Sequence, residues 1–144
     1  MPVSELHVFL IRPTKYDDEG YLLRHWRGVL PSNTLAVLRG LTEQVAREGL
    51  PAGVSTRIFC CDESVEALPE KQIDRARQNP EVKVLVGLVG VQTNQMPRAT
   101  DIAQRMRARG VTVLIGGFHV SGRSCGASAP AEIRRLQEFG VTIV

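Results

Sequence analysis

The residues best suited to contact a ligand form a short run after the apolar residues 111–115. This run is Gly116, Gly117, Phe118, His119 and Val120. Two glycines allow a ligand to approach the backbone closely, and a glycine-rich strand end can leave backbone N–H groups to bind phosphate. His119 has no evident Cys or Asp partner, so a hydrogen-bonded structural histidine is a better interpretation than a base or metal ligand.

Uncharged polar residues form a second candidate, Gln92, Thr93 and Asn94, after the valine-rich residues 82–90. Their amides and hydroxyl suit a neutral polar ligand. The alternative is that Thr93 or Asn94 only caps a helix. Neither run matches G-x-G-x-x-G or a P-loop, which argues against a dinucleotide or nucleoside triphosphate site.

The third candidate is the segment 12–32, which is long for a connection between a strand and a helix. It contains Trp26, the only Trp, and both tyrosines, Tyr16 and Tyr21. Aromatic rings gathered in one loop indicate a flat ligand or a partner surface. The alternative is a short helix that packs its apolar side chains on the domain, namely Leu22, Leu23, Trp26 and Leu30.

The same segment carries three adjacent carboxylates, Asp17, Asp18 and Glu19. They could bind a cation or accept a phosphoryl group, as in a receiver domain. A receiver also needs an acidic pair directly after its first strand, an aspartate after its third and a lysine further on. Those partners are missing, which argues against phosphotransfer.

Composition and charge narrow the classes of function. The 144 residues correspond to one domain, and the formal net charge of +3 comes with no lysine-rich run or RNA-binding signature, so nucleic acid is not a favoured partner. No apolar run approaches the ~18 residues of a membrane span, and the start lacks signal-peptide features. We expect a cytoplasmic protein without a membrane partner. Cys60, Cys61 and Cys125 predict reduced thiols rather than disulfides or a metal site.

Apolar segments alternate with amphipathic ones along the chain. Strands are expected at residues 7–11, 54–61, 82–90, 111–115 and 141–144. Between them lie four helical patterns, of which the first is capped at residues 32–34 and ends at Gly49. Its apolar positions fall at helical spacing, namely Leu35, Leu38, Leu41 and Val45. The others cover residues 70–78, 97–109 and 130–139.

This alternation predicts a doubly wound, flavodoxin-like α/β fold with a parallel five-stranded sheet in the order 2-1-3-4-5 and helices on both faces. Ligands bind such sheets at the carboxyl ends of the strands, where the strand order reverses. The three candidate segments meet there. We expect one domain over residues 1–144, and, because a final helix often follows the fifth strand, an N-terminal fragment of a longer protein.

The stretch VGLVGVQTNQMPRATDIAQRMRARGVTVLIGGFHVSG resembles the cobalamin-binding domain at the amino terminus of many radical S-adenosylmethionine enzymes. In that family a valine-rich strand, a polar loop and a PRA-type helix precede a strand ending in Gly-Gly-x-His. The corresponding pieces here are residues 82–90, residues 91–96, Pro97-Arg98-Ala99 and Gly116-Gly117-Phe118-His119. The opening IRPTKYDDEG is also similar. The resemblance covers most of the chain and is densest over residues 84–122.

The resemblance implies a cobalamin held against the carboxyl ends of the strands, with the loop after strand four beside its nucleotide tail. It carries over Gly116, Gly117, His119 and Val120 as binding residues, and Phe118 is expected to join them as the variable position of Gly-Gly-x-His. Gln92, Thr93 and Asn94 are placed by position. Lys15, Tyr16 and Asp17 fall in the window of the D-x-H-x-x-G motif of cobalamin mutases and methionine synthase. Asp17 stands where the cobalt-ligating His would be, so that motif predicts no protein ligand to cobalt.

The radical enzymes hold an iron–sulfur cluster with CxxxCxxC, which this sequence lacks. The resemblance therefore implies a corrinoid-positioning module, with the cluster and S-adenosylmethionine in a catalytic domain in cis beyond Val144. We predict no catalytic residues and no metal ligands in this chain, and a homodimer stays open.

Two other hypotheses stay open beside it. One is a degenerate domain that has lost cobalamin and serves protein interaction or substrate positioning. The other is a small enzyme or flavin binder, against which Arg12-Pro13-Thr14-Lys15-Tyr16 argues, because flavodoxins place a Ser/Thr/Gly phosphate loop there.

Overall fold

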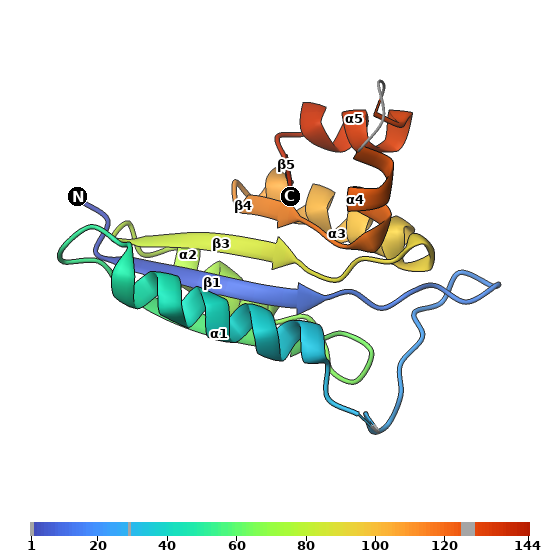
Figure 1. Ribbon diagram of the computed structural model, residues 1–144, viewed down its shortest axis with the longest axis horizontal. Coiled ribbons are helices and arrows are strands. Elements are labelled where there is room, and N and C mark those ends of the chain that lie inside the picture. Colours follow the sequence, from blue (N-terminus) through green and yellow to red (C-terminus); the bar gives the residue numbers. More distant parts are fainter. Residues whose placement is uncertain (1, 29, 125–128) are drawn as a thin grey trace.

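The computed structural model describes residues 2–28, 30–124 and 129–144. Its core is one parallel sheet in the order β2-β1-β3-β4-β5 (Figure 1). The strands are β1 (Glu5–Arg12), β2 (Ser55–Asp62), β3 (Val82–Leu88), β4 (Thr112–Ile115) and β5 (Thr142–Ile143). The helices are α1 (Asn33–Glu48), α2 (Glu70–Arg77), α3 (Met96–Ala108), α4 (Phe118–Ser124) and α5 (Ala131–Glu138), with a short 3-10 helix, η1 (Thr93–Gln95), before α3.

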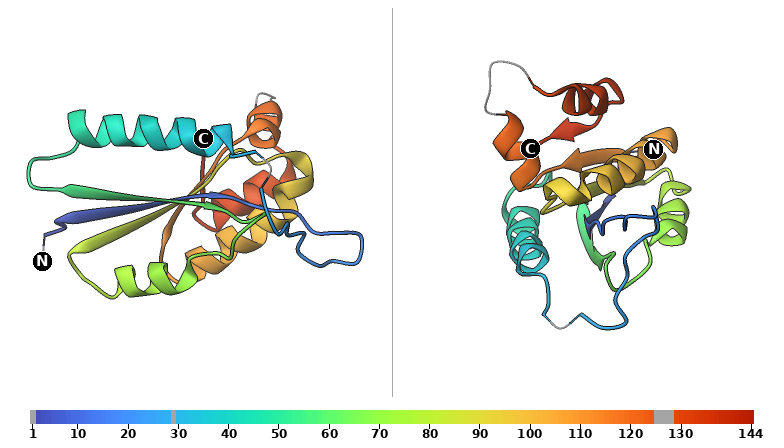
Figure 2. Two further views of the ribbon diagram at one scale, coloured as in Figure 1. Left: turned by 90° about the horizontal axis from the view of Figure 1, so that it is seen from below. Right: turned by 90° about the vertical axis from the view of Figure 1, so that its right-hand side faces the viewer.

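Helices cover both faces of the sheet, as Figure 2 shows with α1 on one side and α2 and α3 on the other. Side chains alternate along each strand, so Phe9 and Ile11 of β1 join the larger core with α2 and α3. Val8 and Leu10, which alternate with them along the strand, pack with Leu35 of α1 instead. The predicted doubly wound, flavodoxin-like fold and its strand order are confirmed.

Helix α1 begins and ends at the predicted signals. The hydroxyl of Ser32 accepts the backbone N–H of Leu35 at 3.3 Å, and Gly49 follows the last turn. Its predicted apolar face is only partly used, because Leu35 is buried whereas Leu41 and Val45 are exposed. The helix therefore leaves part of its apolar face exposed alongside the sheet.

Two connections differ from the expectation. Residues 118–124 form α4, where the sequence indicated a loop. In the segment after β1, none of the described residues is helical, and Tyr16 instead pairs with Leu22 in an isolated antiparallel bridge. The alternative of a packed helix is wrong, because Trp26 is 89% exposed and Leu30 is also exposed. None of the helices in the described part of the chain is long and apolar enough to cross a membrane.

The thiols of β2 are shielded. Cys61 is buried and Cys60 half-buried, both as free thiols, while Cys125 lies outside the described residues. Burial raises the pKa of Cys61 to about 12, and nearby carboxylates such as Glu66 add to the effect.

We expect Cys61 to resist alkylation in the folded protein. In a Cys125→Ser background at pH 8, its reaction with iodoacetamide should be roughly 1,000-fold slower than in the urea-unfolded chain, because so little thiolate is present. Peptide mass mapping measures this rate. Labelling of Cys61 at a similar rate in both states would contradict its burial.

Candidate functional site

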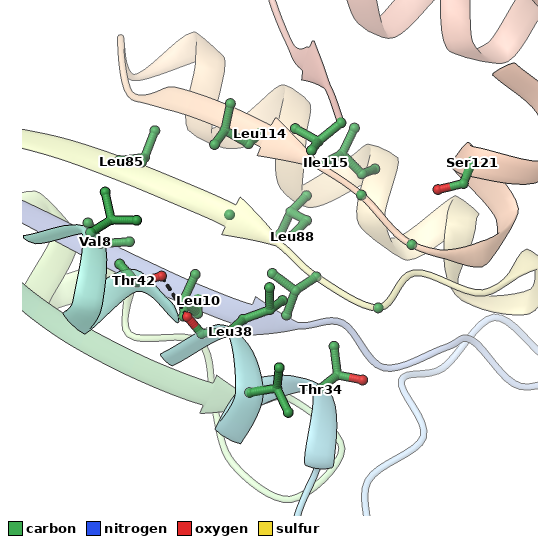
Figure 3. Close-up of a pocket in the computed structure, with 18 of the residues that line it drawn as sticks. Val8, Leu10, Thr34, Leu38, Thr42, Leu85, Leu88, Leu114, Ile115 and Ser121 are labelled. Atoms are coloured by element: carbon green, nitrogen blue, oxygen red, sulfur yellow. Dashed lines mark hydrogen bonds between the residues drawn. The ribbon is translucent and has the colours of Figure 1, made fainter. Parts of the chain in front are cut away.

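An apolar groove lies between α1 and the strands β1, β3 and β4, and has a volume of about 910 Å³. Figure 3 shows aliphatic side chains from both sides pointing into it, with hydroxyls as the only polar groups among the labelled residues. Among the described residues that line it, none is charged. The labelled residues are Val8, Leu10, Thr34, Leu38, Thr42, Leu85, Leu88, Leu114, Ile115 and Ser121.

The groove exists because α1 covers this face of the sheet over β1 but leaves β3 and β4 open. Gly87 of β3 has no side chain to fill the space, and the atom nearest to an added Cβ would be Cδ2 of Leu10, at 3.4 Å. On the opposite wall, Val37 and Val45 of α1 are 60% and 61% exposed. A groove with apolar walls and floor can bind a flat, apolar group.

Glycines form the mouth of this groove at the carboxyl edge of the sheet. Gly90, Gly116 and Gly117 all line it. Gly117 has φ +144°, and a Cβ there would lie 2.1 Å from the backbone nitrogen of Val91. Glycine is therefore required at position 117 because a side chain there would clash with the protein's own backbone. A Cβ at Gly116 would meet only ordinary contacts, the nearest at 3.4 Å from the carbonyl oxygen of Val144.

A second, polar pocket of about 460 Å³ lies at the carboxyl ends of β1 and β2. It has four basic side chains, one acidic side chain and several amides and hydroxyls in its wall. The lining residues include Arg12, Thr14, Lys15, His25, Arg27, Asp62, Ser64, Gln92, Asn94 and Gln95. Gln92 lines both pockets, so they adjoin where the strand order reverses between β1 and β3.

Six of the eleven predicted site residues line one or both of these pockets, among them Gln92, which lines both. Gly116, Gly117 and Phe118 line the groove, where the Phe118 ring is 84% exposed. Lys15 and Asn94 line the polar pocket. The segments after β1, β3 and β4 thus do meet at one edge of the sheet, but they present two surfaces of different chemistry.

Tyr16 and Asp17 bind within the protein. The Tyr16 hydroxyl is hydrogen-bonded to the carboxylate of Asp101 and lies 3.3 Å from Nη1 of Arg98. Burial and the Asp101 carboxylate raise the pKa of Tyr16. The Asp17 carboxylate accepts the backbone N–H groups of Glu19 at 3.0 Å and Tyr21 at 2.8 Å. Asp17 therefore shapes a turn at the tip of this segment.

His119 and Val120 face the interior. Nδ1 of His119 lies 3.0 Å from the Thr93 hydroxyl, and Nε2 lies 2.8 Å from the Glu132 carboxylate. His119 is thus the hydrogen-bonded structural histidine that the sequence indicated, and Val120 is fully buried. Thr93 contacts this histidine, and the cap of η1 comes from Gln92 rather than from Thr93 or Asn94.

A buried ion pair behind the polar pocket was not anticipated from the sequence. Arg98 of α3 binds both carboxylate oxygens of Glu63, with Nε 3.0 and 3.2 Å from them and Nη2 2.5 Å from Oε1. Glu63 also accepts the backbone N–H of Thr14 at 3.1 Å. The hydrogen bonds that Arg98 donates to Glu63 and Tyr16 outweigh burial and raise the pKa of Arg98. The pair joins β2, α3 and the segment after β1.

Comparisons of the chain with protein-family models, with curated proteins and with solved structures find no match.

Proposed function

We propose that this chain binds a corrinoid, with the nucleotide tail in the apolar groove and the corrin ring over the carboxyl edge of the sheet. The observation that carries the proposal is the groove itself, which is uncharged along its described length and opens through Gly90, Gly116 and Gly117. An apolar aromatic base is the kind of group that such a groove binds. The resemblance of residues 84–122 to cobalamin-binding domains supports the same ligand.

The residues present fit a corrinoid without a protein ligand to its cobalt at the D-x-H-x-x-G position. Asp17 occupies that position, and its carboxylate already accepts two backbone N–H groups. The chain would therefore bind the cofactor through its organic parts.

In this proposal the domain positions the cofactor for another domain. A corrinoid supplies organometallic chemistry at cobalt, and the protein supplies position and shielding. A radical S-adenosylmethionine domain in cis, with its own iron–sulfur cluster, is the proposed partner, and the cytoplasm the proposed location. Phe118 and Gln92, beside the mouth of the groove, would lie next to the corrin ring.

A second candidate is an interaction module without a cofactor. The exposed apolar side chains on α1 favour it, because Val37, Leu41 and Val45 present a continuous helical stripe to solvent. An apolar helix from a partner could cover the same groove.

Filling the groove should weaken corrinoid binding. Thr42 lies on the groove wall, so Thr42→Trp should weaken hydroxocobalamin binding by at least about 10-fold, or about 1.4 kcal/mol, in equilibrium dialysis. Gln44→Trp is the matched control, because residue 44 is on the same helix but outside the groove. It should bind like the wild type.

Val45→Trp provides a second test at a more exposed position of the same wall, in case residue 42 does not tolerate the larger ring. Circular dichroism and thermal unfolding verify that each variant is folded. Equal affinity of the wild type, Thr42→Trp and Val45→Trp would contradict a ligand in the groove.

A further inference from the structure

The polar pocket has an excess of positive charge that the fold does not neutralise. Among the described residues in its wall, Asp62 is the only acidic one. That carboxylate accepts Nη1 of Arg12 at 3.1 Å, the backbone N–H of Ser64 at 3.1 Å and the Ser64 hydroxyl at 2.6 Å. Burial opposes its ionisation, but these hydrogen bonds outweigh burial and lower the pKa of Asp62. Asp62 and Arg12 therefore balance each other as a pair.

Two cations remain, Lys15 and Arg27. Across the described residues, neither forms an ion pair with a carboxylate. The Arg27 guanidinium lies 4.6 Å from the ring centroid of Trp26, which leaves its charge uncompensated. Both side chains line the same pocket, and His25 also lines it. The pocket thus has at least two positive charges without a counter-charge in the protein.

The backbone that carries these cations is held by hydrogen bonds. The N–H of His25 donates to the carbonyl of Ser64 at 2.6 Å, and the N–H of Leu23 donates to the carbonyl of Lys15 at 3.0 Å. The buried Thr14 hydroxyl donates to the Leu23 carbonyl at 2.5 Å. The segment after β1 is therefore anchored to β2 beside the pocket. When charged side chains are carried by an anchored backbone, less conformational freedom is lost on binding an anion than when they are carried by a free loop.

We propose that this pocket binds the phosphate group of a small molecule, with Lys15 and Arg27 supplying the charge and Asn94 a neutral donor. Two uncompensated cations match the two negative charges of a phosphate monoester near neutral pH. A pocket of about 460 Å³ suits a small molecule. This site is separate from the corrinoid groove and does not depend on the corrinoid proposal.

Isothermal titration calorimetry on the corrinoid-free chain at low ionic strength tests the site directly. The probes are inorganic phosphate and glycerol 3-phosphate. Trp26 gives a second readout, because it is the only Trp and stacks with Arg27, so its fluorescence should change on binding. Lys15→Gln/Arg27→Gln removes both charges. Lys71→Gln/Lys83→Gln is the matched control, since it removes two exposed charges outside this pocket.

We expect saturable binding of one phosphate per chain, weakened at least about 10-fold in Lys15→Gln/Arg27→Gln and unchanged in the control pair. Tighter binding of glycerol 3-phosphate than of inorganic phosphate would identify a monoester as the ligand, and equal affinity would identify free phosphate. Lack of saturable binding, or equal weakening in both double variants, would overturn the proposal. Neither outcome bears on corrinoid binding, which is measured separately with hydroxocobalamin.

Discussion

Replacing Arg98 with alanine should lower the free energy of unfolding by about 3–5 kcal/mol. The Arg98 side chain is 8% exposed and the Glu63 side chain is fully buried, so the change would leave a buried carboxylate with only the Thr14 N–H as partner. Removing one partner of a buried ion pair destabilises a protein far more than removing one partner of a surface ion pair, because the remaining charge stays buried. Urea denaturation followed by circular dichroism measures the difference.

Arg105→Ala is the matched control on the same helix, because Arg105 pairs with Glu70 at an exposed position. That variant should lose less than about 1 kcal/mol. The double variant Glu63→Gln/Arg98→Met should recover most of the stability that Arg98→Ala loses, since it removes both charges and retains an acceptor for Thr14. A loss from Arg98→Ala no greater than that from Arg105→Ala would show that the pair does not hold these elements together.

Gly117→Ala should destabilise the protein by at least about 3 kcal/mol. At φ +144° an L side chain is strained, and the new Cβ would overlap the Val91 backbone, with its nitrogen at 2.1 Å and its oxygen at 2.6 Å. The three nearest atoms all belong to the backbone of Gly90 and Val91, which cannot move aside as a flexible side chain could. Thermal unfolding measured by differential scanning calorimetry should show the loss as a lower Tm.

Gly122→Ala controls for the substitution itself. Gly122 lies in α4, and no atom would come within 4 Å of its Cβ, so alanine should leave stability unchanged or raise it by up to about 1 kcal/mol. Similar Tm values for Gly117→Ala and Gly122→Ala would contradict the close packing of the residue-117 turn against the segment after β3.

The fold could be predicted because its signals are local. The apolar run at residues 7–11 and the valines of residues 82–90 predicted buried parallel strands, and Gly49 and Gly110 predicted the ends of helices. Helix α4 was missed because Gly, His and Ser in residues 118–124 have weak helical preference. What fixes that helix is long-range, namely the N–H of His119 donating to the Val91 carbonyl at 3.2 Å.

The candidate site was only partly accessible from the sequence. The sequence patterns placed the segments after β1, β3 and β4 at one edge of the sheet. They could not show that Lys15 and Asn94 line one pocket whereas Gly116 and Phe118 line another. The Glu63–Arg98 pair links positions 35 residues apart, and no periodic pattern specifies such a contact. The glycine pair was interpreted as room for a ligand, whereas at Gly117 the close neighbour is the backbone of Val91.

Gln92 gives the two pockets a shared wall at the point where the strand order reverses. An apolar groove on one side and a cationic pocket on the other could bind two ligands, or two parts of one assembly, at the same edge. The groove variants and the charge variants separate these contributions, because each set changes residues that line one pocket and not the other.

A corrinoid held in the apolar groove should stay bound when free ligand is removed. The purified chain is titrated with hydroxocobalamin, desalted and examined by visible absorption, with circular dichroism of the same sample to verify the fold. We expect about one corrinoid per chain to be retained. A folded chain that retains none after desalting would contradict corrinoid binding in the groove and would favour the interaction module.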